Sequence, residues 1–357
     1  MGMTTMSAHT ADPGERARPV RATMRDVAAL AGVSLKTVSR VVNREDGVSG
    51  ELREKVARAA ERLDYRHNLS ASNLRRSHGR TGVIGALLQD VSNSFSSSLL
   101  RTLEDAARSR NGVVLAASLD EETERERALV ADLVSRRVDG LILMPATRDH
   151  AHLASDIRAG LPMVFVDRTP RGVEADSVVV DNRHGARDAT RHLVRHGHRR
   201  IALLADLVTI ETAQDRLEGY ASALRSAGIK LDPSIVATGL RTPEAGEEAL
   251  TRMLNTTSPP TAIFASRNTL SAGAARVLRR LGMSHQVAVV GFDDLPLADL
   301  VDPPLTVIRQ DVASLGRQAA DLLFARIDGD TSPVQHLVIV PSLLARGSGE
   351  IRPAPRR

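Results

Sequence analysis

Residues 23–43, TMRDVAALAGVSLKTVSRVVN, are the stretch that most constrains the fold of this chain. Two short segments are joined at Gly32, and Thr23 and Ser34 stand where each could cap a helix, with Asp26 completing a capping box. Apolar residues recur at helical spacing in both segments: Val27, Ala28, Ala31, Val38, Val41 and Val42. The pattern predicts a helix-turn-helix, whose second helix enters the major groove of DNA.

The second predicted helix leaves a compact polar surface outside this apolar face. Its members are Ser34, Leu35, Lys36, Thr37, Ser39, Arg40 and Asn43. The alternative is an ordinary helical hairpin whose polar face is only solvated. The charge distribution favours DNA, because residues 1–80 hold 15 Lys and Arg against 9 Asp and Glu, whereas the remaining 277 residues hold 33 against 34. A polyanion is the simplest partner for the basic end.

The composition excludes several classes of protein. The chain has no cysteine, so it can form neither disulfides nor a cysteine-based zinc site. Apolar runs stay well short of a membrane span. Residues 1–20 lack the apolar segment of a signal peptide and are expected to be a disordered tail, which makes the protein cytoplasmic. His192 and His196 stand four apart, yet the segment lacks an H-E-x-x-H pattern, so no metal and no cofactor are expected.

The rest of the chain divides by pattern. A third helix is predicted at about 50–63, capped by Ser49, and completes a helix-turn-helix domain over 21–66. Residues 67–80 are polar and basic and are expected to form a hinge linker, with one helical turn at about 70–75.

From residue 82, apolar strands alternate with helical segments, which predicts an α/β core with parallel sheets covered on both faces. The predicted strands are 82–88, 112–118, 140–145, 162–167, 177–181, 200–206, 261–266 and 287–294, and the predicted helices are 94–110, 122–137, 182–197, 213–228, 243–255 and 268–281.

The length of this core, residues 81–347, favours two lobes. Ligands of such folds bind at the carboxyl ends of strands, and between lobes where there are two. The first lobe is expected at about 81–181 and 310–337, the second at about 182–309 and 338–347, and a C-terminal tail at 348–357. The strand-end candidates are Asp90, Asn93, Phe95, Asp167, Arg168, Arg267, Asn268, Asp293 and Asp294.

These motifs, taken together and in this order, resemble the LacI/GalR-type transcriptional regulators over roughly residues 23–347. The headpiece string DVAALAGVSLKTVSRVVN is followed by V-S-x-x-x-R-x-x-V from Val48, by L-x-Y ending at Tyr65, and by N-x-x-A-x-x-L from Asn68 to Leu74. The core adds IGALLQDVSNSF, RVDGLIL, HLVRHGHRRIALL, TAQDRLEGY, VAVVGFDD and PPLTVIRQD. The resemblance implies a two-lobed core similar to periplasmic binding proteins.

The resemblance also implies a homodimeric repressor on a palindromic operator in double-stranded DNA. Leu35 and Lys36 would meet base edges, and Leu74 would wedge into the minor groove from a hinge helix. The residues expected at the DNA are Thr23, Ser34, Leu35, Lys36, Thr37, Ser39, Arg40, Asn43, Asn68, Ala71 and Leu74.

A small effector, namely a sugar, sugar phosphate or related metabolite, would bind between the lobes and change operator affinity. The residues expected to line its site are Asn93, Phe95, Asp167, Arg168, Thr212, Arg216, Arg267, Asp293 and Gln310. Arg267-Asn268 replaces the usual Asn-Asp of the family, and Arg168 follows Asp167. Two cations near the cleft would favour an anionic effector, unless they pair with Asp167 or Asp293.

Two other classes compete with this reading. A solute-binding module without operator reading would not need the basic headpiece. An α/β enzyme would need a catalytic set, and the chain has neither a phosphate-binding G-x-x-x-x-G-K-[ST] loop nor a G-x-S-x-G elbow. We therefore expect a regulator and not an enzyme.

Overall fold

The computed structural model describes residues 22–42, 47–65 and 80–355. The chain divides into two compact units, with the boundary between Gly79 and Arg80. We call the first unit the headpiece and the second the core. Within the described ranges, no helix is long and apolar enough to cross a membrane.

The headpiece contains the three helices that the sequence predicts. They are α1 (Met24–Ala31), α2 (Leu35–Val42) and α3 (Gly50–Arg62). Thr23 and Asp26 form the capping box of α1, and Gly32 ends that helix in the left-handed conformation at φ 61°, which a residue without Cβ adopts most readily. Ser49 caps α3, and its Oγ accepts from the Leu52 amide at 3.4 Å. The three helices share a small core made by Val27, Ala28, Ala31, Val38, Val56 and Ala59.

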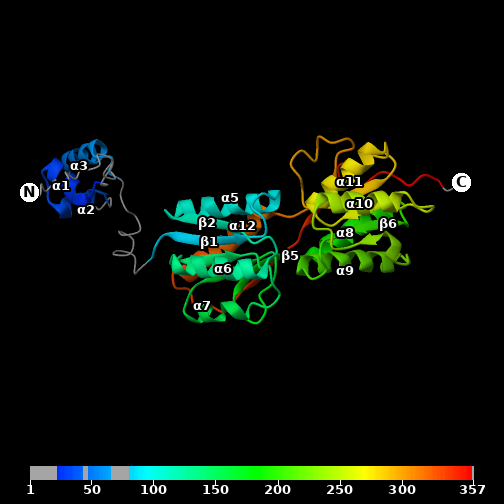
Figure 1. The fold of residues 1–357 in the computed structure, drawn as a ribbon, viewed down its shortest axis with the longest axis horizontal. Coiled ribbons are helices and arrows are strands. Elements are labelled where there is room, and N and C mark those ends of the chain that lie inside the picture. The colour runs from blue at the N-terminus through cyan, green and yellow to red at the C-terminus, as the bar shows by residue number, and fades with distance from the viewer. Residues whose placement is uncertain (1–21, 43–46, 66–79, 356–357) are drawn as a thin grey trace, which may run out of the picture. The chain divides into compact units, whose positions relative to one another are not determined.

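The first lobe of the core is built on a parallel six-stranded sheet, in the order β11-β5-β4-β3-β1-β2. Its strands are β1 (Val83–Leu88), β2 (Val113–Ser118), β3 (Gly140–Leu143), β4 (Met163–Val166), β5 (Asp176–Val180) and β11 (His336–Ile339). The helices of this lobe are α5 (Ser94–Ser109), α6 (Thr123–Ser135), α7 (Ala154–Arg158) and α12 (Val312–Ile327). Figure 1 shows α12, coloured late in the chain, beside α5, coloured early.

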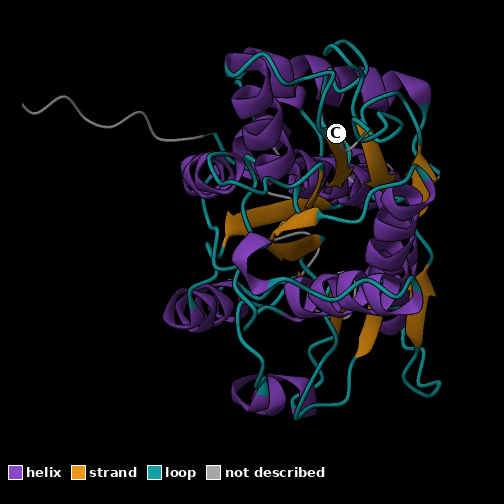
Figure 2. Ribbon diagram, turned by 90° about the vertical axis from the view of Figure 1, so that its right-hand side faces the viewer, coloured by secondary structure: helices purple, strands orange, loops and turns teal. Residues whose placement is uncertain are grey.

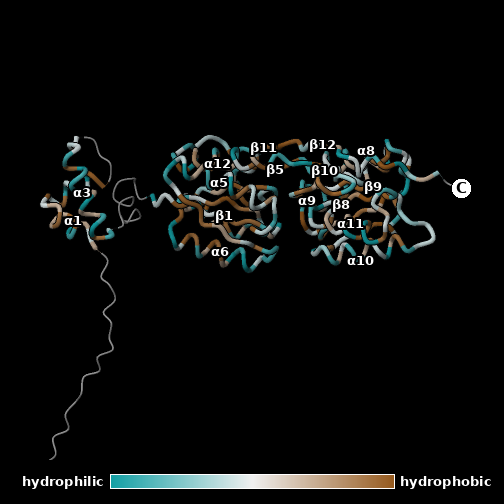
Figure 3. The backbone as a smooth tube through the Cα atoms, turned by 90° about the horizontal axis from the view of Figure 1, so that it is seen from above, coloured by the Kyte–Doolittle hydropathy of each residue, from teal (hydrophilic) through white to brown (hydrophobic). Residues whose placement is uncertain are grey.

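The second lobe repeats this architecture, in the order β12-β10-β9-β8-β6-β7, with β12 antiparallel at the edge. Its strands are β6 (Ile201–Leu204), β7 (Val236–Ala237), β8 (Ala262–Ala265), β9 (Ala288–Phe292), β10 (Thr306–Arg309) and β12 (Ser342–Leu344). Its helices are α8 (Asn182–Arg195), α9 (Glu211–Ser226), α10 (Pro243–Leu254) and α11 (Asn268–Arg280). Figure 2 shows helices flanking the strands, and Figure 3 shows the apolar strands lying inside each lobe.

The two-lobed α/β fold is confirmed. The elements that were not predicted are the helices α7 and α12 and the strands β7, β10, β11 and β12. Several apolar side chains of α12, Leu315 and Leu323 among them, are fully buried in the first lobe. Gly316 allows the helix to approach α5 closely, because a Cβ there would lie 2.8 Å from Thr102. The chain passes between the sheets after β5, after β10 and after β11, so the last passage follows Ile339 and not residue 337.

Residues 348–351 were predicted to belong to a C-terminal tail, but they pack against the second lobe. Ser348 is buried, and its hydroxyl donates to the Val289 carbonyl at 2.6 Å. Glu350 accepts from His192 at 2.5 Å, and His198 Nε2 lies 2.7 Å from the Ile351 carbonyl. The segment therefore belongs to the second lobe.

Candidate functional site

The headpiece presents a polar surface at the start of α2. Ser34 begins the helix, because its Oγ accepts from the Thr37 amide at 3.0 Å while the two hydroxyls lie 2.9 Å apart. Lys36 is exposed, and Leu35 keeps 45% of its surface in solvent although it is apolar. Thr23 is exposed as well, and Thr37, Ser39 and Arg40 are half-buried. Asn43, Asn68, Ala71 and Leu74 lie outside the described residues, as does the predicted hinge turn.

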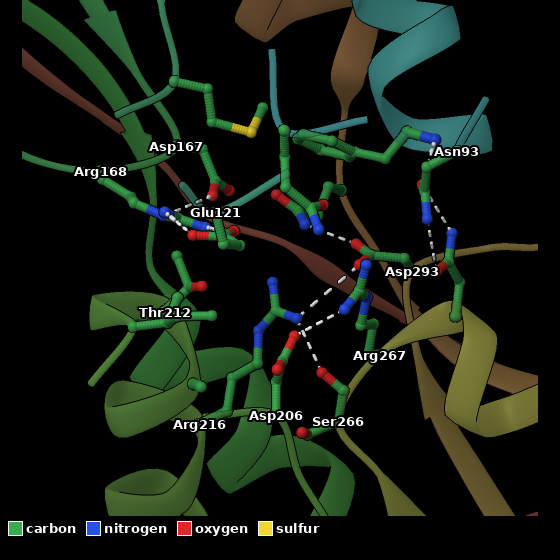
Figure 4. Close-up of a pocket in the computed structure, with 17 residues that line it drawn as sticks. Asn93, Glu121, Asp167, Arg168, Asp206, Thr212, Arg216, Ser266, Arg267 and Asp293 are labelled. Carbon is green, nitrogen blue, oxygen red and sulfur yellow. Dashed lines mark hydrogen bonds and ion pairs between the residues drawn. The ribbon is translucent and has the colours of Figure 1, made fainter. Parts of the chain in front are cut away.

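The cleft is a pocket in the core at the carboxyl ends of strands from both lobes (Figure 4). All nine residues expected to line an effector site lie on its wall. Its other members are Gln89, Glu121, Met144, Asp206, Ile210, Ala213, Ser266 and Asn268. Asp294 is not among them, because its carboxylate turns to Arg346, with both contacts at 2.7 Å. Adjacent residues at the end of β9 thus point to different sides.

Arg216, on α9, is held from several directions. Its Nε donates to Asn182 Oδ1 and one terminal nitrogen donates to the Ser266 carbonyl, both at 2.7 Å. The same nitrogen lies 3.7 Å from Asp293, and the guanidinium lies over the Phe292 ring at 3.8 Å. Burial lowers the pKa of Arg216, and Asp293 opposes that shift. The side chain is therefore a fixed hydrogen-bond donor on the floor of the cleft.

The two acids that end β4 and β9 have strained backbones. Asp167 has φ 68° and Asp293 has φ 70°. These values lie in the left-handed region, which residues other than glycine rarely adopt. Such strain clusters at ligand sites, where the surroundings hold an otherwise unfavourable geometry. Asp293 accepts from Gln310 Nε2 at 2.5 Å. The Asp293–Gln310 pair therefore brings the end of β9 together with the residue that follows β10.

Asp167 is the most perturbed acid of the cleft. Burial raises its pKa to about 6, although Arg168 and Arg216 pull in the opposite direction. Arg168 Nε lies 3.8 Å from the Asp167 carboxylate, which is too long for a hydrogen bond. Asp167 is thus close to its titration point near neutral pH and can either donate or accept a hydrogen bond.

The two other arginines of the cleft already have acidic partners, which removes the premise for an anionic effector. Arg168 makes a bidentate contact with Glu121, at 2.7 and 2.5 Å, and also donates to the Pro145 carbonyl. Arg267 donates to Asp206 at 2.6 Å. The sequence analysis missed Glu121 and Asp206 as partners. Asp206 ends the predicted strand 200–206, so the strand-end rule could have found it.

The polar atoms of the cleft are not all satisfied by the protein. Four carboxylates (Glu121, Asp167, Asp206 and Asp293) face three guanidinium groups (Arg168, Arg216 and Arg267), so the wall carries no excess of positive charge. Among the described residues, Arg168 Nε, Ser266 Oγ and Gln310 Oε1 are buried without a hydrogen-bond partner. Buried polar atoms are normally bonded, so these atoms are ready to bond to a ligand.

The histidines that could suggest a metal site have other partners. His192 contacts Glu350, and His196 Nδ1 lies 2.9 Å from the His192 carbonyl. No group of three potential ligands suited to a metal ion occurs in the part of the chain that the structure describes.

Comparison with known proteins assigns the family. Residues 23–68 match the bacterial regulatory proteins of the lacI family, and residues 81–346 match the periplasmic binding proteins and sugar binding domain of the LacI family. The chain belongs to the LacI family. It is a DNA-binding transcriptional regulator with a ligand-binding core.

Individual relatives of this LacI-family regulator cover nearly its whole length. The HTH-type transcriptional repressor CytR of Escherichia coli K12 is 31% identical over 93% of this chain and 97% of its own length. The transcriptional regulator CelR in complex with cellobiose is 33% identical, with a TM-score of 0.68 over 92% of this chain and all of its own. The Lac repressor dimer, bound to operator and the anti-inducer ONPF, is 29% identical, with a TM-score of 0.79 over 92% of this chain and 99% of its own.

Proposed function

We propose that the protein is a cytoplasmic homodimeric repressor that reads a palindromic operator with α2 and is controlled by a neutral polyhydroxylated effector in the cleft. The observation that carries the DNA-reading part is the exposure of Leu35 and Lys36 at the first turn of α2. Lys36 can donate to a guanine edge, whereas Leu35 can only make apolar contact, such as with a thymine methyl group. Thr23, Ser34, Thr37, Ser39 and Arg40 flank them, and Asn43, Asn68, Ala71 and Leu74 complete the proposed DNA set.

The charges of the cleft favour a neutral effector. Arg168 and Arg267 are each paired with a carboxylate, so their positive charge is already balanced by Glu121 and Asp206 and offers less attraction to a phosphate or carboxylate ligand. Hydroxyl groups can instead donate to Asp167 or Asp293 and accept from the free Nε of Arg168. The cellobiose bound by CelR is a ligand of this class.

Exposed apolar side chains support the homodimer. Val113 and Leu115 lie on β2, an edge strand, and are 58% and 41% exposed. Leu297 and Leu300, in the loop after β9, are 67% and 74% exposed. Apolar surfaces of this kind mark association sites. The Lac repressor relative is itself a dimer on its operator.

Control follows from a population shift. The core has two lobe arrangements that differ in operator affinity, and an effector acts by its difference in affinity for them, typically about 1–3 kcal/mol of coupling. An effector that prefers the operator-competent arrangement is a corepressor, and one that prefers the other is an inducer. No catalytic step is needed, and we propose that the protein is not an enzyme.

The test of operator reading is selection of tight binders from a random duplex library, followed by sequencing. We expect a palindrome. We expect Lys36→Ala to relax the base preference at one position of each half-site, and we expect Lys55→Ala, which removes the same charge from α3, to leave that preference unchanged. A ligand mixture of neutral sugars is included in a parallel selection, so that a corepressor requirement is detected. The absence of enrichment in both selections would overturn the operator claim.

The effector class is tested separately by thermal shift. We expect neutral sugars such as cellobiose to raise the unfolding temperature of the core, and we expect their phosphate esters to have a smaller effect. Stabilisation by sugar phosphates alone would restore the anionic effector and overturn the neutral one.

A further inference from the structure

Contacts between the lobes are not confined to the cleft. Arg148 follows β3 in the first lobe and is exposed, yet its guanidinium reaches the second lobe. Its Nε donates to the Thr209 carbonyl at 2.6 Å, and a terminal nitrogen donates to Gln214 Oε1, also at 2.6 Å. The Val208 carbonyl lies 3.4 Å from the same terminal nitrogen. One side chain thus binds the segment that leads into α9, the helix that carries Arg216.

Arg241 makes the reverse connection. It precedes α10 in the second lobe and donates to the Asp120 carbonyl of the first lobe at 3.0 Å. Asp120 and Glu121 are consecutive residues with φ of 54° and 60°, so this turn is strained and needs external support. Glu121 in turn holds Arg168 on the wall of the cleft. Arg241 therefore fixes the backbone beside a residue of the ligand site without lining that site itself.

Both arginines bind uncharged acceptors across the gap, and neither lines the cleft. A ligand does not need to touch either of them. Residues of both lobes line the cleft. Parting the lobes widens the cleft for an effector, and it breaks the contacts of Arg148 and Arg241.

We propose that Arg148 and Arg241 form an interlobe clasp that holds the core closed without an effector and so sets how readily the effector site opens. They are positioning residues and not ligand contacts. The functional meaning of the clasp rests on the proposed effector control, but its existence does not. Loss of the clasp would raise the fraction of cores with parted lobes, in which the cleft is wider.

Other contacts also cross between the lobes. Outside the cleft, Thr169 Oγ1 donates to Glu211 at 2.7 Å, and this contact adds to the two arginines. A further pair lies in the cleft itself and is less suited to the role of a clasp. Asn93 and Asn268 exchange amide hydrogen bonds at 3.1 and 3.0 Å, and both line the cleft. A bound ligand would compete for these amides directly, so their substitution would mix ligand contact with closure. Because Asn93 and Asn268 lie at the cleft and are not substituted, hydrogen exchange near them shows whether the lobes have parted.

The test is amide hydrogen exchange, followed by mass spectrometry, on the full chain without effector or DNA. The variants are Arg148→Gln, Arg241→Gln and their combination. The matched control is Arg252→Gln, which removes an arginine whose contact with Glu248 stays within α10. We expect the double variant to exchange about three to ten times faster in peptides covering residues 92–97 and 265–270, on the two sides of the Asn93–Asn268 contact. We expect the control variant to exchange at the rate of the parent.

The outcomes separate a clasp from a local structural role. A local role would speed exchange only in peptides that contain residues 148 or 241 or their acceptors, and that result, or no change, would overturn the proposal. The unfolding temperature of each variant shows whether the core remains folded. If the double variant does not fold, the two single variants are used for the exchange measurement. Because the experiment uses neither operator nor effector, its failure cannot be confused with failure of the proposed function.

Discussion

The headpiece surface and the cleft solve the problem of recognition in opposite ways. Leu35 and Lys36 stand in solvent on a helix whose stability depends on other residues, namely the buried Val38 and the cap at Ser34. In the cleft, Arg216, Asp293 and Arg168 are buried and bonded to one another or to the backbone before any ligand arrives. Binding at the headpiece adds contacts, whereas binding in the cleft exchanges them.

This difference has an energetic consequence. A residue of the headpiece surface can be replaced at little cost to the fold, because exposed substitutions usually change stability by less than about 0.5 kcal/mol. A substitution in the cleft is expected to change the stability of the core, in a direction set by the residue, because it alters the balance of charge in a buried network. Function and stability are therefore separable in the headpiece and coupled in the cleft. Four substitutions, each with a control variant, test that contrast.

The largest effect is expected for Arg216→Met. The change leaves Asp293 with less positive charge nearby and removes the donor from Asn182 Oδ1 and the Ser266 carbonyl. Loss of one partner from a buried charged group costs about 3–5 kcal/mol. We expect the free energy of unfolding of the core to fall by that amount in urea, together with the loss of effector binding. Arg225→Met, on the exposed side of the same helix, should change the free energy of unfolding by less than about 0.5 kcal/mol. Equal losses in the two variants would contradict the coupling.

Asp167→Asn should stabilise the core in a pH-dependent way. The pKa of Asp167 is about 6 in the folded state against 3.8 as the ordinary value, so between these pH values the folded chain holds a proton that the unfolded chain has lost. The stability of the parent therefore falls as the pH rises through this window, by up to about 3 kcal/mol in total. The asparagine variant lacks that fall, and its advantage should grow from pH 4 to pH 7 in urea titrations.

Asp294→Asn provides a control of opposite sign for this pH dependence. Hydrogen bonds from Arg346 hold the pKa of Asp294 below its usual value, so this acid stabilises the fold above the ordinary pKa and loses that effect as the pH falls. Its substitution should destabilise the core at neutral pH and matter less in acid. If the difference in the free energy of unfolding between the parent and Asp167→Asn stays constant across pH 4–7, the pKa of Asp167 is not raised in the folded state.

The same contrast explains what the sequence could reveal. The headpiece surface follows from local rules, because the caps, the helical spacing and Gly32 all lie within one short segment. The cleft residues were named from strand ends and from the family resemblance, and the structure brings all nine to one wall. Their partners were not foreseen. Glu121 lies in a left-handed turn far in sequence from Arg168, and only the fold brings them together.

The element that the sequence analysis missed most clearly is α12. Its residues Leu315, Ala319, Leu322 and Leu323 recur at helical spacing, but the stretch after β10 was assigned to the first lobe without any element. The short edge strands β7 and β12 were missed for another reason. Strands of two or three residues are stabilised by pairing with β6 and β10 and carry too little pattern of their own to be recognised.

Lys36→Ala should affect binding and leave stability alone. Loss of a base-edge contact costs about 1–3 kcal/mol of operator affinity and relaxes the choice of base at one position in each half-site. The unfolding curve should not move, because Lys36 is exposed. Fluorescence anisotropy with the selected operator measures specific binding, and anisotropy with a random duplex measures nonspecific binding. If Lys55→Ala lowers the affinity for DNA at all, it should lower it equally for the two duplexes. An equal loss of affinity for both duplexes in Lys36→Ala would show that Lys36 contacts a phosphate and not a base.

The smallest effect is expected for Ser49→Ala, and it tests whether headpiece and core stabilities are separate. Ser49 Oγ accepts from the Leu52 amide at 3.4 Å, a long contact, so loss of the cap should cost about 0.5–1 kcal/mol. Because the headpiece is a compact unit of its own, calorimetry should show its transition at lower temperature and the core transition unmoved. Thr242→Val removes a cap from α10, where Oγ1 accepts from the Ala245 amide at 3.2 Å, and should lower the core transition alone. A single transition that shifts in both variants would mean that the units unfold together, and stability could then not be assigned to the headpiece separately.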